Sequence, residues 1–193
     1  TDGVQPAPAA TVKAERLSLA GISQKVTASS GTSLDATAPK DTAPKDTAPT
    51  EKTPTALNLE ANQITLGTQL VKGESPRAES LAINGFSQVN ITGQAGISGQ
   101  GKTLLDVGGN VLLTGPLTTL NQGDLSIKAQ GTLTTRQGAD TTPNSAATGD
   151  GLGGTLSLSA QQLDIASQLK AASGQVRLAS EGAINLQKGA SLD

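Results

Sequence analysis

The sequence predicts an all-β fold, a right-handed parallel β-helix in which one chain winds as a solenoid with three short strands in each coil. Short apolar–x–apolar triplets recur along the chain, and Gly, Asn, Thr and Ser separate them. The triplets fall into groups of three whose first members often lie about 20 to 24 residues apart, a period typical of solenoids. Right-handedness is expected because crossover connections between parallel strands are almost always right-handed.

The triplets have the pattern of half-buried strands. Apolar and polar residues alternate with a period of two, so every second side chain faces the same side of the strand. Each run is too short for a stable helix, and the glycines between runs also disfavour helix. None of the nine prolines lies inside a triplet, as expected because proline cannot donate to a strand ladder. The triplets are Leu17/Leu19, Leu57/Leu59, Ile64/Leu66, Leu81/Ile83, Val89/Ile91, Leu105/Val107, Val111/Leu113, Leu125/Ile127, Leu156/Leu158, Leu163/Ile165, Val176/Leu178 and Ile184/Leu186.

Apolar residues at equivalent places in successive coils are expected to stack into continuous columns. A single coil cannot bury its own apolar face, so the stacking of neighbouring coils forms the core. One predicted column contains Leu57, Leu81, Leu105, Leu125, Leu156 and Val176. The other contains Ile64, Val89, Val111, Leu133, Leu163 and Ile184.

Two polar insertions interrupt the repeat. Residues 1–35 are expected to form a first coil with a frayed amino terminus, and residues 56–193 the remaining coils. Between them, residues 36–55 contain the near-repeat TAPKD-TAPKD-TAPTEK, which favours an extended solvated loop. Residues 136–154 are a second inserted loop, rich in glycine and threonine. The triplet grouping places both insertions before the first strand of a coil, so we expect them to leave the same corner.

The composition excludes several classes of function. The 193 residues contain neither cysteine nor histidine, which excludes disulfides, thiol chemistry, histidine acid–base catalysis and most transition-metal sites. The formal net charge is −2 and Phe86 is the one aromatic residue, so neither electrostatics nor base stacking favours a nucleic-acid partner. No apolar stretch is long enough to span a membrane, and we expect no membrane insertion. The sequence also lacks methionine, and we expect it to be a piece of a longer protein.

The segment Gly96–Thr103, GISGQGKT, fits the P-loop pattern G-x-x-x-x-G-K-[ST]. In a nucleotide-binding site the loop amides bind phosphates, the lysine neutralises them and the threonine hydroxyl meets Mg²⁺. The motif also requires a helix after the loop, but Leu104–Val107 leads directly into two further glycines. We therefore interpret the segment as a glycine-rich turn between two coils.

Two other motifs have simple interpretations. The sequence GDGLGG at residues 149–154 faintly resembles a calcium-binding glycine nonapeptide, but a single copy favours a flexible loop. Asn90-Ile91-Thr92 is a glycosylation sequon, which we interpret as an ordinary strand segment. The sequence therefore predicts no metal site and no cofactor.

A β-helix polysaccharide lyase or hydrolase is the main enzymatic alternative. Such an enzyme needs carboxylates clustered on adjacent coils, often with Lys or Arg nearby. Asp106 and Asp164 are expected to face outward on different columns and coils, and Asp124 is expected in a turn. No pair is expected to be close, and the usual aromatic platform for sugars is missing. We therefore predict no catalytic, cofactor-binding or metal-binding residues, and a protein that is not an enzyme.

Four runs resemble the repeats of filamentous haemagglutinin-like exoproteins, which are two-partner-secretion adhesins. They are GNVLLTG (109–115), GDLSIKAQGTLTT (123–135), GGTLSLSAQQLDIAS (153–167) and SGQVRLASEGAINLQKGASLD (173–193). The resemblance covers most of residues 57–193, and more loosely residues 11–35. It is a style of repeat rather than a unique motif. The Asn-Pro motifs of that family's secretion domain, such as NPNG, do not occur here, which indicates interior shaft.

The resemblance implies a non-catalytic shaft, exported through an outer-membrane transporter to the bacterial surface, that holds an adhesive or toxic region away from the cell. Its partners would be receptors on host or bacterial cells, reached through the full-length protein. If this segment itself binds anything, the two insertions are the candidates, because loops carry function on rigid scaffolds. Of the usual anchor residues they hold only Arg136, which favours a passive spacer. The alternatives are a polysaccharide lyase or hydrolase fragment, the stalk of a contact-dependent toxin carrier, and a disordered secreted segment.

Overall fold

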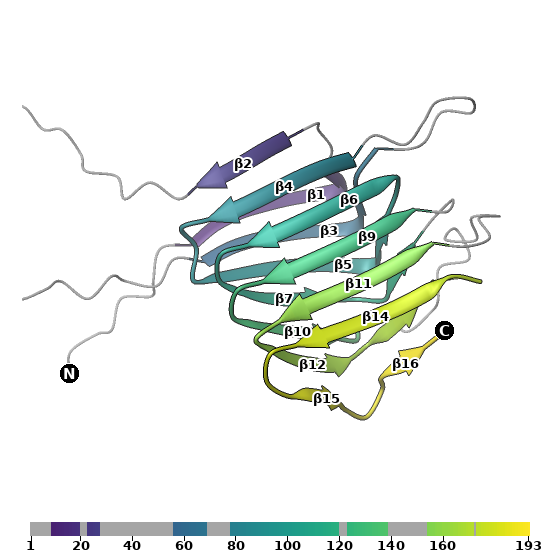
Figure 1. Cartoon of the computed structure of the whole chain (residues 1–193). Helices are drawn as coiled ribbons and strands as arrows, with labels where there is room; N and C mark the ends of the chain where they lie inside the picture. The colour runs from purple at the N-terminus through teal and green to yellow at the C-terminus, as the bar shows by residue number, and fades with distance from the viewer. Residues whose placement is uncertain are drawn as a thin grey trace, which may run out of the picture.

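The chain forms parallel β-strands that are gathered into two sheets (Figure 1). The computed structural model describes residues 9–19, 23–27, 56–68, 78–119, 123–138, 154–171 and 173–193, and within these ranges there are strands and turns but no helix. One sheet has ten strands and the other has six. The prediction of an all-β fold with parallel strands is confirmed.

Each strand is short, except where one strand serves two places in the repeat. The ten-stranded sheet contains β1 (Ala9–Leu19), β3 (Ala56–Leu66), β5 (Gln88–Gly99), β7 (Asn110–Thr114), β8 (Leu117–Thr119), β10 (Thr132–Arg136), β12 (Gln162–Ala166), β13 (Gln168–Lys170), β15 (Ile184–Leu186) and β16 (Ser191–Leu192). The six-stranded sheet contains β2 (Ser23–Thr27), β4 (Ala78–Asn84), β6 (Lys102–Val107), β9 (Asp124–Ala129), β11 (Thr155–Ala160) and β14 (Gln175–Ser180).

The chain alternates between the two sheets. After each strand of the six-stranded sheet it enters the ten-stranded sheet, where the described residues form one long strand, two short strands or, after β9, the single short strand β10. Strand β6 pairs with β9 and strand β7 with β10, so successive repeats add successive strands to each sheet. Figure 1 shows the two sheets face to face, and in both sheets successive strands are added from the top of the view to the bottom. This order is compatible with the predicted solenoid.

Aliphatic side chains from both sheets form one core. The triplet residues alternate between buried and partly exposed positions along each strand, as their period of two predicts. Burial of each large aliphatic side chain contributes roughly 1.5–3 kcal/mol before the entropy of ordering is subtracted. The core residues with no measurable exposure are Ile64, Val89, Ile91, Ile97, Leu105, Val107, Leu113, Leu125, Leu133, Leu156, Leu163, Ile165 and Leu169.

The predicted second column is correct from Val89 onward, but its first member is wrong. Val89, Val111, Leu133, Leu163 and Ile184 are successive parallel partners in the ten-stranded sheet. Leu57, which was assigned to the other column, is the residue that pairs with Val89.

Ile64 belongs to a third column, which continues through Ile97, Leu117, Leu169 and Leu192. The first predicted group, which begins at Leu57, is therefore shifted by one strand. Its triplets occupy the second and third strand places of a repeat, not the first and second. Strand β3 runs without interruption through both places that a repeat occupies in the ten-stranded sheet, so Leu57 and Ile64 are second and third members rather than first and second.

The predicted first column contains a second error, in register. Leu81 is opposite Leu105 as predicted, but Leu105 is opposite Ile127 rather than Leu125. Leu125 is opposite Thr103. Leu125 and Ile127 face the same side of β9, because side chains two residues apart share a face. The apolar pattern alone therefore does not distinguish these two registers.

In one repeat, β10 is the only strand of the ten-stranded sheet among the described residues. After β10 the chain enters residues 139–153, which lie outside the described residues, and it next appears at β11 in the six-stranded sheet. Strand β8 consequently pairs with β13, with Leu117 opposite Leu169. The predicted second insertion thus stands where the other described repeats have a third strand.

The expectation that both insertions leave the same corner is wrong. Residues 36–55 lie outside the described residues, but the strands around them show the connection that they occupy. The first insertion lies between β2 of the six-stranded sheet and β3 of the ten-stranded sheet. The second follows β10 of the ten-stranded sheet and precedes β11 of the six-stranded sheet. The error has the same cause as the wrong column: the triplet grouping makes Leu57 the first strand of a repeat, although it lies in the ten-stranded sheet, where the second and third strands are.

Candidate functional site

The P-loop segment Gly96–Thr103 is a strand, a turn and a strand. It covers the end of β5, a tight turn and the start of β6 in the other sheet. The amide of Ile97 donates to the carbonyl oxygen of Pro116 at 2.9 Å, and the amide of Gln100 donates to that of Leu66 at 2.8 Å. These amides hold neighbouring repeats together, whereas a phosphate-binding loop presents its amides to the ligand.

The positions of Thr103 and Lys102, the two side chains that would contact a nucleotide, also follow from the strand and turn. Thr103 is 7% exposed, and its hydroxyl donates to the carbonyl oxygen of Gln100 at 2.9 Å. Lys102 is exposed at the start of β6. The geometry favours the interpretation of this motif as a turn between repeats.

The three carboxylates considered for catalysis lie on different strands. Asp106 is on β6 in the six-stranded sheet, and Asp164 is on β12 in the ten-stranded sheet. Asp124 was predicted in a turn but is the first residue of β9, opposite Lys102 and Thr155. The turn ends one residue earlier than expected. Within the described residues, no group of three or more acidic side chains could hold a metal ion.

Asp106 is the least satisfied carboxylate of the three. It lies between Ala82 and Lys128 on the neighbouring strands, and its Oδ1 atom is buried without a hydrogen-bond partner among the described residues. A carboxylate in such surroundings is a candidate for function in general. Glycoside hydrolysis, however, requires a second carboxyl group across the scissile bond. Neither neighbour supplies one.

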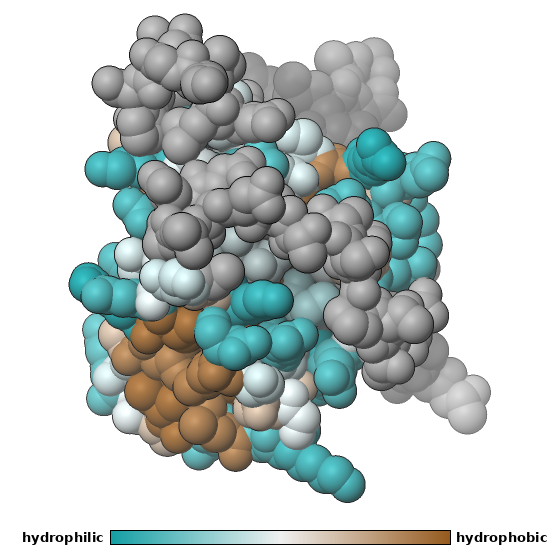
Figure 2. All heavy atoms as spheres, turned by 90° about the vertical axis from the view of Figure 1, so that its right-hand side faces the viewer, coloured by the Kyte–Doolittle hydropathy of each residue, from teal (hydrophilic) through white to brown (hydrophobic). Residues whose placement is uncertain are grey.

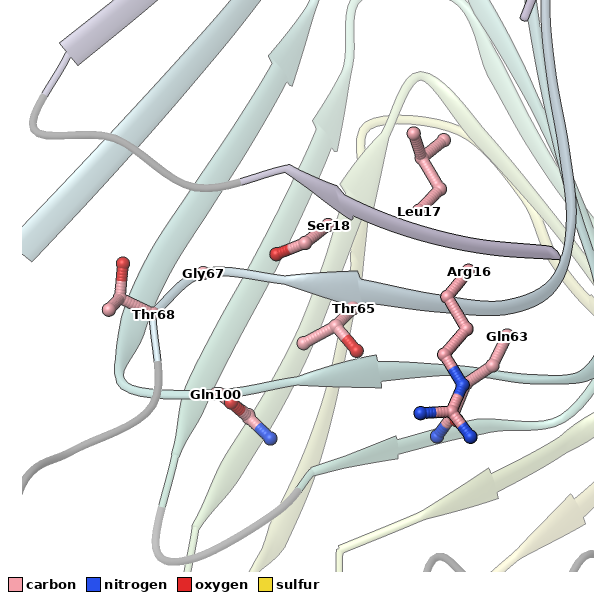
Figure 3. Close-up of a pocket in the computed structure, with 8 residues that line it drawn as sticks. All are labelled: Arg16, Leu17, Ser18, Gln63, Thr65, Gly67, Thr68 and Gln100. Carbon is pink, nitrogen blue, oxygen red and sulfur yellow. The ribbon is translucent and has the colours of Figure 1, made fainter. Parts of the chain in front are cut away.

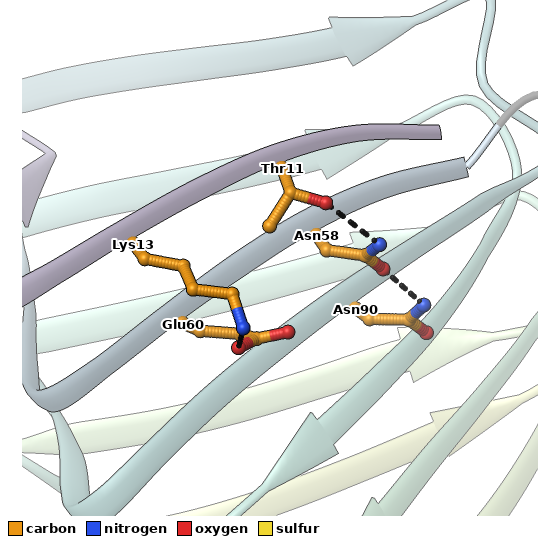
Figure 4. Close-up of polar contacts among 5 residues, drawn as sticks. All are labelled: Thr11, Lys13, Asn58, Glu60 and Asn90. Carbon is orange, nitrogen blue, oxygen red and sulfur yellow. Dashed lines mark hydrogen bonds and ion pairs between the residues drawn. The ribbon is translucent and has the colours of Figure 1, made fainter. Parts of the chain in front are cut away.

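The sequon residue Asn90 takes part in a ladder of polar side chains on the outer face of the ten-stranded sheet (Figure 4). Its amide donates to Asn58 Oδ1 at 2.7 Å, and the Asn58 amide donates to the Thr11 hydroxyl at 3.2 Å. Gln88 donates to Asn90 Oδ1 at 3.0 Å. Asn58 thus belongs to the outward column of Asn90, not to that of Ala82 as the sequence grouping implied. These contacts fit the interpretation of the sequon as an ordinary strand segment.

Asp164 extends the same outward column near its other end. Asn185 donates to Asp164 Oδ1 at 2.7 Å, and Gln162 donates to Asp164 Oδ2 at 3.1 Å. The partners of this carboxylate among the described residues are amides, and no lysine or arginine there forms an ion pair with it. The contact is a structural link between repeats.

A polar hollow lies on the outer side of β1, β3 and β5 (Figure 3). Its volume is about 360 Å³, at the lower end of the range for small-molecule sites. Arg16 is the charged group in its lining, and Figure 3 shows Gln63 and Thr65 on the neighbouring strand, while Leu17 points to the other side of β1. The described residues of its lining include no carboxylate and no aromatic ring. The Arg16 guanidinium can donate hydrogen bonds to a solute, and the amides and hydroxyls can donate or accept them, but these groups provide no acid–base pair.

A second hollow follows the edge where the six-stranded sheet turns toward the ten-stranded sheet. Its lining includes Lys128, Gln130, Ser159 and Glu181, together with small alanine side chains. Ser180, which also lines it, donates to the carbonyl oxygens of Gln161 and Ala183 at 2.8 and 3.1 Å. The hydroxyl of Ser180 therefore holds a turn rather than serving as a nucleophile.

The sequence interpretation did not identify either hollow. Each one collects residues from three successive repeats, so the residues become neighbours only through the stacking register. The predicted binding candidates were the insertions, and residues 36–55 and 139–153 lie outside the described residues. Arg136, the predicted anchor residue, is exposed at the end of β10, where its carbonyl oxygen accepts from Gly115 at 2.8 Å.

The chain has no match among known proteins by three comparisons. No protein family, no curated protein and no solved structure matches it. Among the described residues there is no helix long and apolar enough to cross a membrane.

Proposed function

We propose that this chain is a non-catalytic segment of the shaft of a large secreted bacterial surface adhesin, folded as a right-handed parallel β-helix. The observation that carries this proposal is the register of the strands. Like residues of successive repeats are direct parallel partners, as in the series Leu57, Val89, Val111, Leu133 and Leu163. A stack of this kind lengthens by simple repetition, which is the property that a shaft requires.

The outward side chains support a structural role over a catalytic one. In the described residues they form polar ladders such as Thr11, Asn58 and Asn90, and carboxylates are spread over separate strands. The described residues that line the two hollows include no pair of acids and no aromatic ring. A surface of this composition stays hydrated, and its described residues do not bring together the groups that bond cleavage needs.

The proposed setting is the outside of a bacterial cell. The shaft reaches the surface through an outer-membrane transporter and carries adhesive or toxic regions of the full-length protein toward receptors on host or bacterial cells. The resemblance of four runs to filamentous haemagglutinin-like repeats supports this setting. A contact-dependent toxin carrier would use the same kind of shaft.

Duplication of one repeat tests the shaft directly. Lys102 is the register partner of Asp124, and the neighbouring pair Asn110 and Thr132 shows that the repeat is 22 residues long at this place. A second copy of residues 102–123, inserted after residue 123, should add one layer. We expect an unchanged strand spectrum in circular dichroism, a cooperative melt and a longer particle in small-angle X-ray scattering. Loss of the cooperative melt would contradict a repetitive stack.

Two further assays test the functional part of the proposal. The purified chain should cleave none of a panel of acidic polysaccharides, measured by release of reducing or unsaturated ends. It should also show no saturable binding to epithelial or bacterial cells. Cleavage would favour the β-helix lyase or hydrolase, and saturable binding would show that this segment is itself adhesive.

A further inference from the structure

The layer of β6, β7 and β8 and the layer of β11, β12 and β13 are separated by different numbers of strands on different sides of the stack. In the six-stranded sheet, Leu105 and Leu158 are two strand steps apart, because Ile127 lies between them. At the second strand place, β7 and β12 are also two steps apart, with β10 between them. At the third place, β8 and β13 are direct neighbours. We call the column of β8, β13 and β16 the short side of the stack.

The short side is closed where β8 meets β13. Leu117 and Leu169 pair directly, and both are fully buried. Thr119, at the end of β8, is also buried, and a Cβ atom on Gly154 would lie 3.2 Å from its hydroxyl oxygen. Gly154 comes immediately before β11, so the end of β8 approaches the start of β11. Figure 2 looks onto this side of the molecule, because β16 lies on the right-hand side of Figure 1. The two layers are therefore in close contact on the short side, as in other protein interiors.

Two layers that are closer on one side than on the other two cannot be parallel. Each strand step is about 4.8 Å, so the spacing between the layers is about 4.8 Å smaller on the short side. The width over which this difference acts is given by Val111 and Leu117, which are six residues apart along the layer. At about 3.3 Å per residue this width is about 20 Å, and the tilt between the layers is on the order of 15°.

We propose that the repeat containing β9 and β10 introduces a fixed bend into the rod, toward the short side. The neighbouring described layers have strands at all three places, so the bend is confined to this one repeat. Direct strand pairing and buried leucines hold the layers together on the short side. The bend is therefore a rigid part of the fold.

The bend has a use in the proposed shaft. Every layer beyond β11 is turned through the same angle relative to the layers before β9, so a repeat of this kind sets the direction of the part of the rod that follows. This use rests on the proposed function. The bend itself does not, because it follows from the strand pairing alone.

Two pairs of spin labels measure the two sides of the stack. Glu60 and Ala166 are four strand steps apart at the second place, through Thr92, Thr114 and Arg136. Thr65 and Lys170 start and end in the same layers but are three steps apart, through Ser98 and Thr118. The chain has no cysteine, so each pair can be replaced by two cysteines that carry nitroxide labels.

Electron paramagnetic resonance then gives the distance between the two labels of each pair. The backbone separations should be about 19 Å for Glu60→Cys with Ala166→Cys and about 14 Å for Thr65→Cys with Lys170→Cys. We therefore expect the second pair to be shorter by about one strand step. Equal distances for the two pairs would mean that the layers are parallel, and the proposal would be overturned.

A variant with a completed repeat tests the cause of the bend. Thr114 is the register partner of Arg136, and Asp124 is that of Thr155, so residues 115–123 occupy the connection that corresponds to residues 137–154. Replacement of residues 137–154 by a copy of residues 115–123 should place a strand between β8 and β13. The distance between the labels at positions 65 and 170 should rise to about 19 Å, while that between positions 60 and 166 stays unchanged.

The outcomes of this replacement are distinct. Melting curves establish that the variant is folded. An unchanged distance between positions 65 and 170 in the folded variant would show that the missing strand does not cause the bend, and would contradict the proposal. If the variant does not fold, the comparison of the two label pairs in the wild-type background still decides. Polysaccharide cleavage or cell binding by the chain would overturn the proposed shaft without changing either distance.

Discussion

Leu117 and Leu169 are direct parallel neighbours, although the repeat that contains Leu133 lies between their repeats in the sequence. On the other side of the ten-stranded sheet this repeat does contribute a strand, β10, where Leu133 lies between Val111 and Leu163. The stack therefore has one layer fewer on the side of β8 and β13 than on the side of β7 and β12. The stack therefore keeps its pairing where β8 meets β13 directly, with no strand between them.

Two adjacent leucines should differ strongly in their effect on stability. Leu105 has no exposed surface, whereas Leu104 beside it is 37% exposed. Leu105→Ala leaves a cavity between Leu81 and Ile127 and should cost about 2–5 kcal/mol of unfolding free energy. Leu104→Ala is the matched control and should cost less than about 1 kcal/mol. Urea denaturation measures both, and equal costs would count against the buried columns.

Two buried serines should respond to alanine in opposite directions. Ser98 donates to the carbonyl oxygen of Ile64 at 3.3 Å, so Ser98→Ala should cost about 1 kcal/mol. Ser167 is fully buried, and its hydroxyl has no hydrogen-bond partner among the described residues. Ser167→Ala removes an unsatisfied polar group and should raise the melting temperature. A fall in melting temperature for Ser167→Ala would indicate a partner for this hydroxyl.

Asn58 should contribute more to stability than its charged neighbour Glu60. Asn58 accepts from Asn90 and donates to Thr11, whereas Glu60 pairs with Lys13 at 2.7 Å on a surface where both side chains are well exposed (Figure 4). Asn58→Ala should cost about 1–2 kcal/mol, since two hydrogen bonds are lost. Glu60→Gln should cost less than about 0.5 kcal/mol, because solvent screens an exposed ion pair. A larger loss for Glu60→Gln in thermal melts would reverse this ranking.

Two glycines near the turn between β7 and β8 form another matched pair. Gly115 has φ +125°, and a Cβ atom there would lie against the carbonyl oxygen of Gly93. Gly115→Ala should therefore cost about 1–3 kcal/mol. At Gly138 the nearest atom to a Cβ would be the Gln94 carbonyl oxygen at 3.4 Å, so Gly138→Ala should be neutral or slightly stabilising. Chemical denaturation of the two variants checks the difference.

The sequence was sufficient to predict which residues form strands and which faces they bury. Triplets such as Val111/Leu113 and Leu163/Ile165 alternate with period two, and burial follows that alternation. The sequence also indicated that Gly96–Thr103 is a glycine-rich turn between two strands, because no helix follows it. The segment contains the residues of the P-loop pattern, but the sequence after it lacks the helix that a P-loop requires.

Register and phase were not predictable from the same pattern. A shift of two residues keeps every apolar side chain on its face, so Leu125 and Ile127 were equivalent partners for Leu105 until the strands were placed. The phase of the first repeat depended on the position of the first insertion, because it follows β2 of the six-stranded sheet and the first triplet after it, Leu57/Leu59, already lies in the ten-stranded sheet. Pro116, which has no amide to donate, marks the division between β7 and β8, but no residue around the first insertion signals which sheet the chain enters after it.

The pairing of β6 with β9 offers the most direct test of the stacked columns. Leu104 lies opposite Ser126, and Asp106 lies opposite Lys128, with all of these side chains on the outer face. In this cysteine-free chain, Leu104→Cys with Ser126→Cys should oxidise readily to an intramolecular disulfide without loss of the cooperative melt. Asp106→Cys with Ser126→Cys should oxidise poorly, because its residues are diagonal neighbours. Preferential oxidation of the Asp106 pair would place Leu105 opposite Leu125 and contradict the register on which the columns depend.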